Sequence, residues 1–409
     1  MLCGTNMADV KISNRSAVLR LLHESGGMSR KQIAAQLKLT PASITVIIND
    51  LIQEAILGEG TTVPNTGTAG RREILVDISR SKYIALGFAL RKEEVRLTVT
   101  NLCGDLVYED AALLPETTTP QYFVDTAFRL YSMMMASRQY CTDAIVGAGV
   151  TICGVVDCAN GIILDSDGIW EERDVPIEKM LRRLFPFPVF VANNVRSYAN
   201  AYSFLLCDQA LKNMLFIRNE ANMGAALILD NQFYDGDRNR SAAIAHVTVE
   251  PDGRPCHCGK RGCLDTVASM QGMMNSLREC FSPEHTPFLF EFCAGDFSKV
   301  TFSLFMKAVS AGDPGACTVM ENALRQFATV LAFSIQLLDV QRIVFYGEMF
   351  ENRLYFSRLR QLLSEKCPDN IRGNVYDVVP SDMKLERKAA PILAVSVFFN
   401  AGGYKTKTA

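Results

Sequence analysis

The 409-residue sequence predicts an α/β protein that begins with a winged helix-turn-helix. Three observations support this fold class. Helical patterns fill most of the first 80 residues and end in a hairpin pattern, strand-like apolar runs take over at Tyr83, and further helical patterns alternate with them. With 48% hydrophobic and 21% charged residues, the chain has the composition of a globular protein, and its length suffices for two or three domains.

The first two helices are marked by their ends. Apolar residues recur at helical spacing over residues 14–24 (NRSAVLRLLHE), and Gly26 ends this helix. Ser29 and Gln32 then make a capping box, in which each side chain satisfies the other's free backbone N–H. A second helix is therefore expected to begin at this box.

A third helix follows after a tight turn. Thr40 is a suitable N-cap, and Pro41 suits the first helical position because proline has no N–H to leave unpaired. Two helices joined in this way, with another before them, are typical of a helix-turn-helix. Apolar residues three or four apart predict the buried face of the third helix: Ile44, Ile48, Leu51 and Ile52.

Residues 56–77 follow the third helix and predict a wing. They contain a strand-like start, a Gly-, Thr- and Pro-rich stretch (GEGTTVPNTGTAG), the pair Arg71 and Arg72, and the alternating run EILVDI. Such a pattern indicates a hairpin with a basic tip.

The outer face of the third helix, which includes Ala42 and Val46, is expected to enter the major groove of DNA. Asparagine can pair bidentately with adenine there, and serine and threonine hydroxyls can contact bases or phosphates. Basic side chains at the start of the second helix would hold phosphate, and those of the wing would reach the minor groove or the backbone. The residues expected to contact DNA are Arg30, Lys31, Thr40, Ser43, Thr45, Asn49, Arg71 and Arg72.

The weak charge of this region leaves a second interpretation open. Up to Arg80, nine basic residues against seven acidic ones leave a net charge of only +2, and the whole chain carries −2. Any contact with DNA must therefore be local, and the three helices could instead form a protein-interaction module with a solvated polar face. Dimerisation would double the DNA contacts and make binding steeply dependent on salt.

A cysteine cluster late in the chain predicts a metal site. Cys256, Cys258 and Cys263 fall within eight residues, and His246 lies ten residues upstream at the end of an apolar, strand-like run. Zn²⁺ binds four nitrogen and sulfur ligands in a tetrahedron, so three thiolates and one imidazole complete its shell and leave no place for water. We therefore expect a structural Zn²⁺ rather than a catalytic one.

Two alternatives to this site remain open. Free cysteines are often buried as small core residues, and ten others are scattered through the chain. His257, between two of the cysteines, could replace His246 as a ligand. Glycines and prolines interrupt the cluster, however, and such loops suit metals better than cores.

Cysteine usage and hydropathy also predict the compartment. Thirteen cysteines, an odd number without a regular framework, fit reduced thiols better than disulfides. No run approaches the roughly 18 apolar residues that a membrane-spanning helix needs, and the N-terminus has no signal-peptide pattern. A cytoplasmic protein without membrane contact is expected.

Residues 245–269 (AHVTVEPDGRPCHCGKRGCLDTVAS) closely resemble the zinc loop of the ROK family, in which the ligands have the same order of one His and three Cys. That family groups sugar-responsive bacterial repressors, sugar kinases and uncharacterised relatives. The resemblance implies an actin-like, ribonuclease H-like fold of two lobes. It suggests a DNA-binding domain over 1–80, a first lobe over 81–200 completed by a C-terminal helix at 389–402, and a second lobe over 201–388 with the zinc loop and an oligomer face.

The resemblance also implies that phosphoryl transfer has been lost. The turn that cradles ATP phosphates in the family's kinases carries an Asp, two glycines and a Thr. Aligned on Gly87, these positions hold Ala89, then Arg91 and Lys92, then Glu93, so that side chains fill the phosphate space and Glu93 adds a like charge.

The general base of the family's kinases is also missing from this sequence. It is an Asp where this chain has Asn194, and an amide cannot accept the proton of the attacking hydroxyl. Losing a general base costs roughly 10²–10⁴-fold in rate, so kinase activity is not expected.

The family's sugar cleft suggests the ligand residues. The matching positions here are Gly154, Asn193, Asn194, His246 and Asp265. Because Ala243 stands where the family has a sugar-binding carboxylate, ordinary hexoses should bind weakly, and a modified sugar or another metabolite is an alternative effector.

The expected function is that of a ROK-type transcriptional regulator, a repressor, which binds double-stranded operator DNA as a homodimer or homotetramer and senses a sugar or sugar derivative. An ATP-dependent sugar kinase and a ligand-independent DNA-binding or docking regulator are the alternatives.

Overall fold

The computed structural model describes residues 6–63, 73–138, 140–206, 212–367, 375–380 and 383–404. The chain divides into two compact units, Met1–Gln209 with Lys384–Ala409, and Ala210–Met383. Each unit is described by itself below. Across the described ranges, no helix combines the length and the apolar character that a membrane crossing requires.

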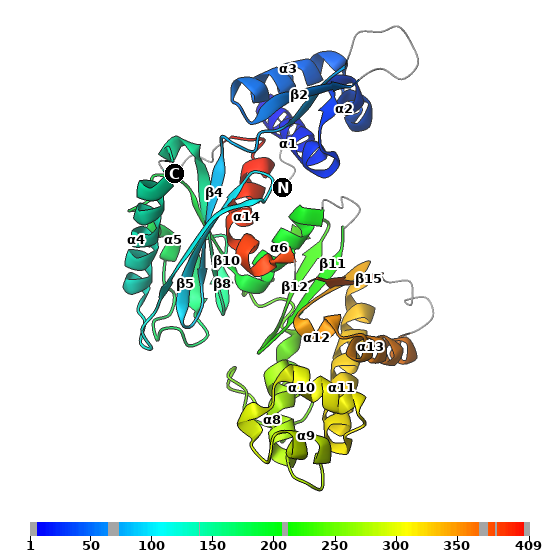
Figure 1. The fold of residues 1–409 in the computed structure, drawn as a ribbon. Helices are drawn as coiled ribbons and strands as arrows, with labels where there is room; N and C mark the ends of the chain where they lie inside the picture. The colour runs from blue at the N-terminus through cyan, green and yellow to red at the C-terminus, as the bar shows by residue number, and fades with distance from the viewer. Residues whose placement is uncertain are drawn as a thin grey trace. The chain divides into compact units, whose positions relative to one another are not determined.

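The first unit begins with a helix-turn-helix and a wing (Figure 1). The strands form a sheet in the order β1-β3-β2, in which β2 and β3 are the antiparallel wing. The wing tip, with Arg71 and Arg72, lies outside the described residues. The elements are α1 (Met7–Ser25), β1 (Met28–Ser29), α2 (Arg30–Leu37), α3 (Pro41–Gln53), β2 (Leu57–Val63) and β3 (Glu73–Ile78).

The local signals for these helices are confirmed, with one correction. Ser29 and Gln32 form the capping box of α2, and Thr40 caps α3. The first helix, however, begins at Met7 rather than at residue 14, because Asn6 accepts a hydrogen bond from the backbone of Asp9 in a further capping box. Residues 7–13 bury no side chain, so the apolar periodicity that marks residues 14–24 does not extend over them.

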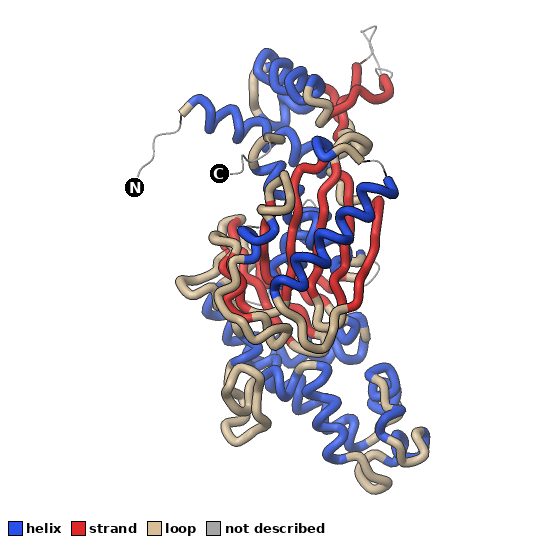
Figure 2. Tube along the Cα trace, turned by 90° about the vertical axis from the view of Figure 1, so that its left-hand side faces the viewer, coloured by secondary structure: helices blue, strands red, loops and turns tan. Residues whose placement is uncertain are grey.

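The first lobe is a sheet in the order β10-β7-β4-β5-β6, with β4, β5 and β6 antiparallel and β7 and β10 parallel to β4. Helices α4 and α5 cover one face, and α6 and α14 cover the other (Figures 1 and 2). The elements are β4 (Ile84–Leu90), β5 (Glu94–Asn101), β6 (Leu106–Leu113), α4 (Pro120–Arg138), a 3₁₀ turn (Thr142–Ala144), β7 (Ile145–Ile152), β8 (Val155–Asp157), β9 (Ile162–Asp165), α5 (Ile177–Leu181), β10 (Val189–Asn193), α6 (Asn194–Leu206) and α14 (Leu385–Asn400).

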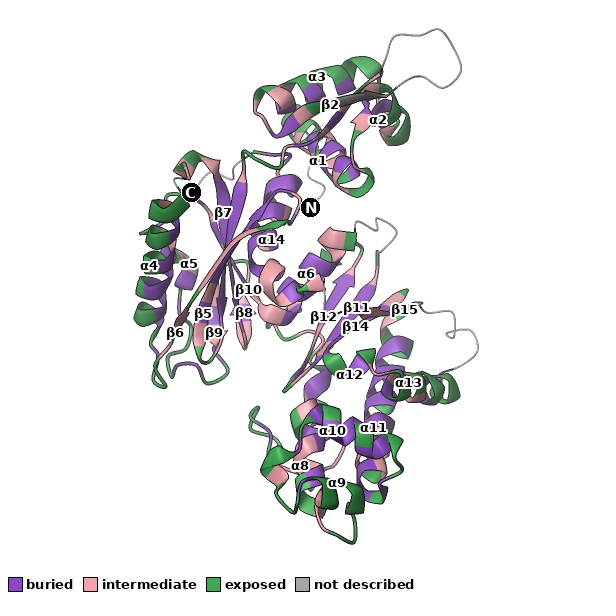
Figure 3. Cartoon of the chain, viewed as in Figure 1, coloured by how far each residue is buried: buried purple, intermediate pink, exposed green. Residues whose placement is uncertain are grey.

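The C-terminal helix α14 lies directly on this sheet, where β4 and β7 are buried along their whole length (Figure 3). Two glycines allow the close approach. A Cβ on Gly149 would lie 1.9 Å from the carbonyl oxygen of Ala390, and a Cβ on Gly87 would lie 2.1 Å from Cδ of Pro391. No side chain fits at either position, so α14 packs backbone against backbone.

The helix-turn-helix is fixed to the first lobe by a buried arginine. Arg15 of α1 is fully buried, and its Nε donates to the carbonyl oxygen of Gly402, just beyond α14. Its guanidinium also pairs with Glu54 and lies 4.2 Å from the ring centre of Tyr404. Apolar residues of α1 and α3 share one core with residues of β7 and α14.

The second unit repeats the topology of the first lobe. Its sheet has the order β13-β12-β11-β14-β15, again an antiparallel meander of three strands followed by two parallel ones. The sequence did not reveal this duplication, but the two-lobed fold is confirmed. The strands are β11 (Met214–Asn219), β12 (Met223–Leu229), β13 (Gln232–Phe233), β14 (Arg342–Tyr346) and β15 (Val375–Val379).

The helices of the second unit pack around α11, whose buried residues lie at the centre of the unit's core. They are a 3₁₀ turn (Ile244–His246), α7 (Leu264–Ala268), α8 (Met270–Cys280), α9 (Pro287–Phe292), a 3₁₀ turn (Phe297–Lys299), α10 (Phe302–Ser310), α11 (Pro314–Leu338), α12 (Glu348–Glu351) and α13 (Arg353–Lys366).

The prediction that His246 ends a strand-like run is wrong. His246 closes a 3₁₀ turn, because Ala242 has a φ of +55° and its carbonyl accepts from the N–H of Ile244. Short apolar runs do not distinguish strands from buried turns.

Candidate functional site

The four residues predicted to bind metal lie together in the second unit. One ligand atom from each of His246, Cys256, Cys258 and Cys263 lies within 4.8 Å of all the others. The Sγ of Cys256 is 3.6 Å from Nδ1 of His246, and the Sγ atoms of Cys258 and Cys263 are 3.6 Å apart. Zinc bonds of about 2.3 Å to sulfur and 2.0 Å to nitrogen separate tetrahedral ligands by roughly 3.5–3.8 Å. Two of the six pairs therefore have the separation of a tetrahedral shell, and the other four lie within 4.8 Å.

The loop backbone holds the cysteines in place. The N–H of Cys256 donates to Lys260, and the N–H of Gly259 donates back to Cys256, which makes a tight turn between the ligands. Gly262 has a φ of +62°, and a Cβ there would lie 1.4 Å from the carbonyl oxygen of Glu250. Only glycine fits directly before the third cysteine.

Arg254 anchors the loop to the helices behind it, a role that the sequence did not reveal. Its guanidinium donates to the carbonyl oxygens of Thr266 and Gly272 and pairs with Glu279. Arg254 thus ties the loop to α7 and α8. An arginine between a glycine and a proline carries no local signal for such a role.

The thiols differ in how readily they ionise. Burial raises the pKa of Cys256 to about 12. Burial also acts to raise the pKa of Cys258, but a hydrogen bond from the backbone N–H of Lys260 contributes to holding that pKa below its ordinary value. A bound cation would favour the thiolate at both positions.

His257 belongs to a second, overlapping group. Its Nδ1 lies 3.9 Å from Cys256 Sγ and 3.9 Å from Oδ2 of Asp265, and these three residues also form a cluster of potential ligands. The set of four includes His246 and not His257.

Asp265 is held in place by the backbone. It lies in α7 with only 6% of its surface exposed, and its Oδ1 accepts a hydrogen bond of 2.6 Å from the N–H of Met223. The carboxylate thus links α7, directly after the metal loop, to the start of β12.

The other predicted ligand residues form a separate cluster in the first unit. Gly154 follows β7 with a φ of +106°, and its carbonyl oxygen accepts a hydrogen bond of 2.6 Å from Nδ2 of Asn193. The Oδ1 atoms of Asn193 and Asn194 both accept from the N–H of Val195. The structure therefore brings Gly154, Asn193 and Asn194 together at the start of α6.

Cys153 joins this cluster and was not predicted. Its Sγ lies 3.2 Å from Nδ2 of Asn194, which points the amide at the loop after β7. The resemblance pointed only to its neighbour Gly154.

The predicted DNA-binding face is exposed on α3. Its outer residues contact solvent, and Val46 is 58% exposed. Arg30 is partly withdrawn, because it donates to Oδ1 of Asn49 and pairs with Glu59. The exposed members of the predicted set are Lys31, Thr40, Ser43, Thr45 and Asn49.

The turn between β4 and β5 is a closed hairpin. The N–H of Arg91 donates to the carbonyl oxygen of Glu94, and the two side chains approach to 3.9 Å. Lys92 and Glu93 are exposed at its tip. Arginine, lysine and glutamate side chains thus occupy the positions where the resemblance has the phosphate-binding glycines and threonine.

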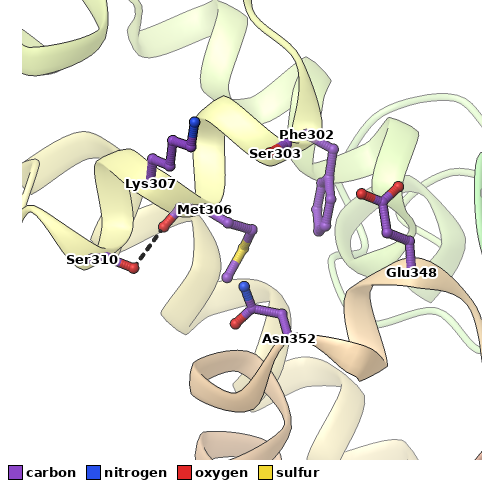
Figure 4. Close-up of a pocket in the computed structure, with 7 residues that line it drawn as sticks. All are labelled: Phe302, Ser303, Met306, Lys307, Ser310, Glu348 and Asn352. Atoms are coloured by element: carbon purple, nitrogen blue, oxygen red, sulfur yellow. Dashed lines mark hydrogen bonds between the residues drawn. The ribbon is translucent and has the colours of Figure 1, made fainter.

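A cavity of about 460 Å³ lies elsewhere in the second unit, between α10 and the start of α12 and α13 (Figure 4). Phe302 and Met306 provide its apolar surface, and Lys307 and Glu348 carry opposite charges at its wall. None of the residues predicted from the sequence lines it.

Comparison with known proteins identifies the family. The model of the ROK family matches residues 87–392, which is well over half of the chain. The chain belongs to the ROK family. The MarR family model, in addition, matches residues 13–56, which span most of the helix-turn-helix.

Relatives of this ROK protein include DNA-binding regulators. The N-acetylglucosamine repressor of Escherichia coli O6:H1 is 29% identical over 350 residues, which cover 85% of this chain and 83% of the relative. A crystal structure of a ROK family transcriptional regulator, described as a homologue of the E. coli MLC protein, matches with a TM-score of 0.79 at 20% identity and covers 96% of this chain and 98% of that one.

A kinase of the family has the same fold over a smaller part of the chain. The ROK hexokinase of Thermus thermophilus matches with a TM-score of 0.60 at 19% identity, and covers 77% of this chain and 99% of the hexokinase. The fold is thus common to kinases and regulators, and this ROK protein also has a DNA-binding type of domain at its N-terminus.

Proposed function

We propose that this ROK protein is a sugar-responsive transcriptional repressor whose kinase-like domain senses and does not catalyse. The observation that carries the proposal is the exposed polar face of α3 in a helix-turn-helix that is fused to a ROK domain. The likeness to the N-acetylglucosamine repressor, which extends over 85% of the chain, supports a regulator over an enzyme.

The helix-turn-helix with its wing, from α1 to β3, is called the head below. It would read DNA through the outer face of α3. Asn49 is the best placed to read a base, because its side chain is exposed and Arg30 bonds to only one of the two lone pairs of Oδ1, so that Oδ1 can still accept while Nδ2 donates. Ser43 and Thr45 bond to their own helix and would position the head on phosphates. Lys31 and Arg30 would lie against the phosphate backbone of DNA. Arg71 and Arg72 remain the proposed DNA contacts of the wing.

Asn49→Ala is expected to weaken operator binding by about 1–3 kcal/mol, or roughly 5–150-fold, because one base contact is lost. The operator fragment would come from selection of genomic DNA fragments on the purified protein, and affinity would be measured by fluorescence anisotropy. Gln53→Ala, at the C-terminal end of the same helix, is the control and should change affinity less than twofold. Equal affinity of Asn49→Ala and wild type for the selected fragment would contradict the assigned DNA face.

The kinase-like domain would bind a modified sugar as its effector. Its proposed ligand residues are Gly154, Asn193 and Asn194 in the first unit and His246 and Asp265 in the second. The name of the N-acetylglucosamine repressor suggests an N-acetylated amino sugar. Since Ala243 replaces a carboxylate, a ligand that brings additional polar groups is favoured over a plain hexose.

Loss of phosphoryl transfer follows from two residues. The amide of Asn194 cannot take a proton from a sugar hydroxyl, and it is held towards Cys153. The hairpin at Arg91 bonds to itself where ATP phosphates would need free backbone N–H groups.

Neither wild type nor Asn194→Asp is expected to turn over ATP with a panel of hexoses and N-acetylated hexosamines in a coupled assay. The restored carboxylate supplies a base but leaves the phosphate turn closed. Sugar-dependent ADP formation by the wild type that Asn194→Ala abolishes would instead establish a sugar kinase with a fused DNA-binding domain.

The tetrahedral cluster would hold a structural Zn²⁺ through His246, Cys256, Cys258 and Cys263. When bound, the ion would fix the loop before α7, and Asp265 with it. The repressor would act in the cytoplasm as a homodimer or homotetramer, because two heads must reach two half-sites about one DNA turn apart. Phe333 and Leu337, which are 65% and 69% exposed on α11, are candidates for the contact between copies.

A further inference from the structure

Helix α6 joins the proposed sensing loop to the DNA-binding head. It begins at Asn194, beside Gly154 and Cys153, and its last turn contains Phe204. These ends are about 15 Å apart at a rise of about 1.5 Å per residue. A single helix therefore spans the distance from the loop after β7 to α1 of the head.

The far end of α6 contacts α1 of the head through His23. Nε2 of His23 lies 3.0 Å from the carbonyl oxygen of Phe204, and the two rings are 4.1 Å apart between centroids. Phe399 of α14 completes the cluster, 5.9 Å from His23 and 5.5 Å from Phe204. Burial holds the pKa of His23 below its ordinary value, so the ring is neutral and donates from Nε2 to the carbonyl.

The head also contacts the lobe through a stronger attachment at the end of α14. Arg15 is fully buried and donates to the carbonyl oxygen of Gly402, and its guanidinium lies over the ring of Tyr404, whereas its ion pair with Glu54 lies within the head. A hydrogen bond from a charged group contributes about 1.5–3 kcal/mol, and one neutral hydrogen bond about 0.5–1.5 kcal/mol. The head thus has a firm attachment at α14 and a weaker one at α6.

Because the two attachments differ in strength, the head can rotate about the Arg15 contact when the His23 contact moves. A shift of α6 along α14 would leave the Arg15 attachment intact and act on the head through His23. The contact between the two helices includes one hydrogen bond of 3.0 Å from Asn200 to Ser396. Packed helices shift by small sliding movements, and such shifts commonly carry a signal between sites.

We propose that α6 is the coupling helix of this repressor: a ligand bound at Gly154, Asn193 and Asn194 shifts α6, and His23 transmits the shift to the DNA-binding head. This inference rests on the proposed function. His23 is a positioning residue, since it contacts neither the sugar nor DNA.

The test compares how much N-acetylglucosamine weakens binding of the selected operator fragment by wild type and by His23→Phe. Phenylalanine keeps the aromatic contact and loses the hydrogen bond. A response of at least about fivefold in the wild type is expected to fall below about twofold, because allosteric coupling is typically 5–150-fold. Sugar affinity, measured by calorimetry, and DNA affinity without sugar should stay within about threefold. His23→Gln, which restores a donor, should regain part of the response.

Arg20→Ala is the matched control, because Arg20 joins the same helix α1 to Asn400 at the end of α14 and not to α6, at 2.5 Å. It should respond to the sugar as the wild type does. A full sugar response in a folded His23→Phe protein would overturn the coupling role of α6.

A second measurement needs no ligand and separates the inference from the proposed function. In a double-mutant cycle, Asn194→Leu perturbs one end of α6 and His23→Phe the other, and operator affinity is the readout. We expect the effect of Asn194→Leu to shrink at least about threefold in the His23→Phe background. Additive effects would overturn the coupling helix. If no sugar changes DNA binding by the wild type, sugar sensing fails, and the cycle still decides on α6.

Discussion

Removing the metal from this protein is expected to loosen the loop 246–263 and α7 and to lower the thermal midpoint of the second unit by about 6–20 °C. Zinc bound to small folded peptides contributes roughly 10–16 kcal/mol. Here α7 and the loop also pack on the unit's core through Leu264 and Ala268, so about a third of that value is expected to appear as lost stability. A loss of about 3–5 kcal/mol corresponds to this shift at about 2–4 °C per kcal/mol in a domain of this size.

The measurement combines metal analysis, thermal melting and hydrogen exchange before and after chelation. Cys258→Ser should behave like the chelated protein, since a serine hydroxyl does not replace a thiolate on zinc. Cys317→Ser is the matched control in the same unit. Its thiol donates to the carbonyl oxygen of Val309, which a hydroxyl also satisfies. Protein grown with ample zinc that contains none, or a Cys258→Ser variant with wild-type metal content and melting, would exclude the site.

Local signals explain which parts of the fold could be predicted. Ser29 with Gln32 and Thr40 with Pro41 specify helix starts within four residues, and the structure has both. The spacing of the three cysteines likewise limits their sulfurs to one loop, and they lie together with His246. In each case the partners are close in sequence or belong to one motif.

Contacts between distant segments could not be predicted in this way. Arg15 reads as a helix residue of ordinary polarity, yet it is fully buried, and its acceptor Gly402 lies 387 residues away. His23 and Phe204 are 181 residues apart and were likewise missed. Periodicity finds the face that a helix buries, but it does not say which element covers that face.

Gly149 shows a role that depends on a distant segment and carries no local signal in the sequence. In the structure Gly149 lies inside β7, and its missing side chain admits the carbonyl of Ala390. Both α14 and the head that is attached to it depend on that close approach.

Gly149→Ala is therefore expected to destabilise the first unit by about 3–5 kcal/mol, at the upper end of what single substitutions do. The new methyl group would lie 1.9 Å from a backbone oxygen, and neither β7 nor α14 can turn a side chain away to relieve the clash. Because α14 ends at the Arg15 attachment, moving it should also raise hydrogen exchange in α1. Urea unfolding followed by circular dichroism gives the stability, and hydrogen exchange locates the change.

Gly58→Ala in β2 is the control, since a Cβ there meets nothing within 4 Å, and its effect should stay below about 1 kcal/mol. Ala390→Gly distinguishes the cause of the Gly149 effect. The colliding atom is the carbonyl oxygen of residue 390 and not its side chain, so the double variant should remain as unstable as Gly149→Ala alone. Rescue by Ala390→Gly, or a loss below about 1 kcal/mol for Gly149→Ala, would mean that α14 does not lie on β7 at this distance. The rigid connection from the sheet through α14 to the head would then have to be abandoned, and with it the fixed pivot against which α6 is proposed to act.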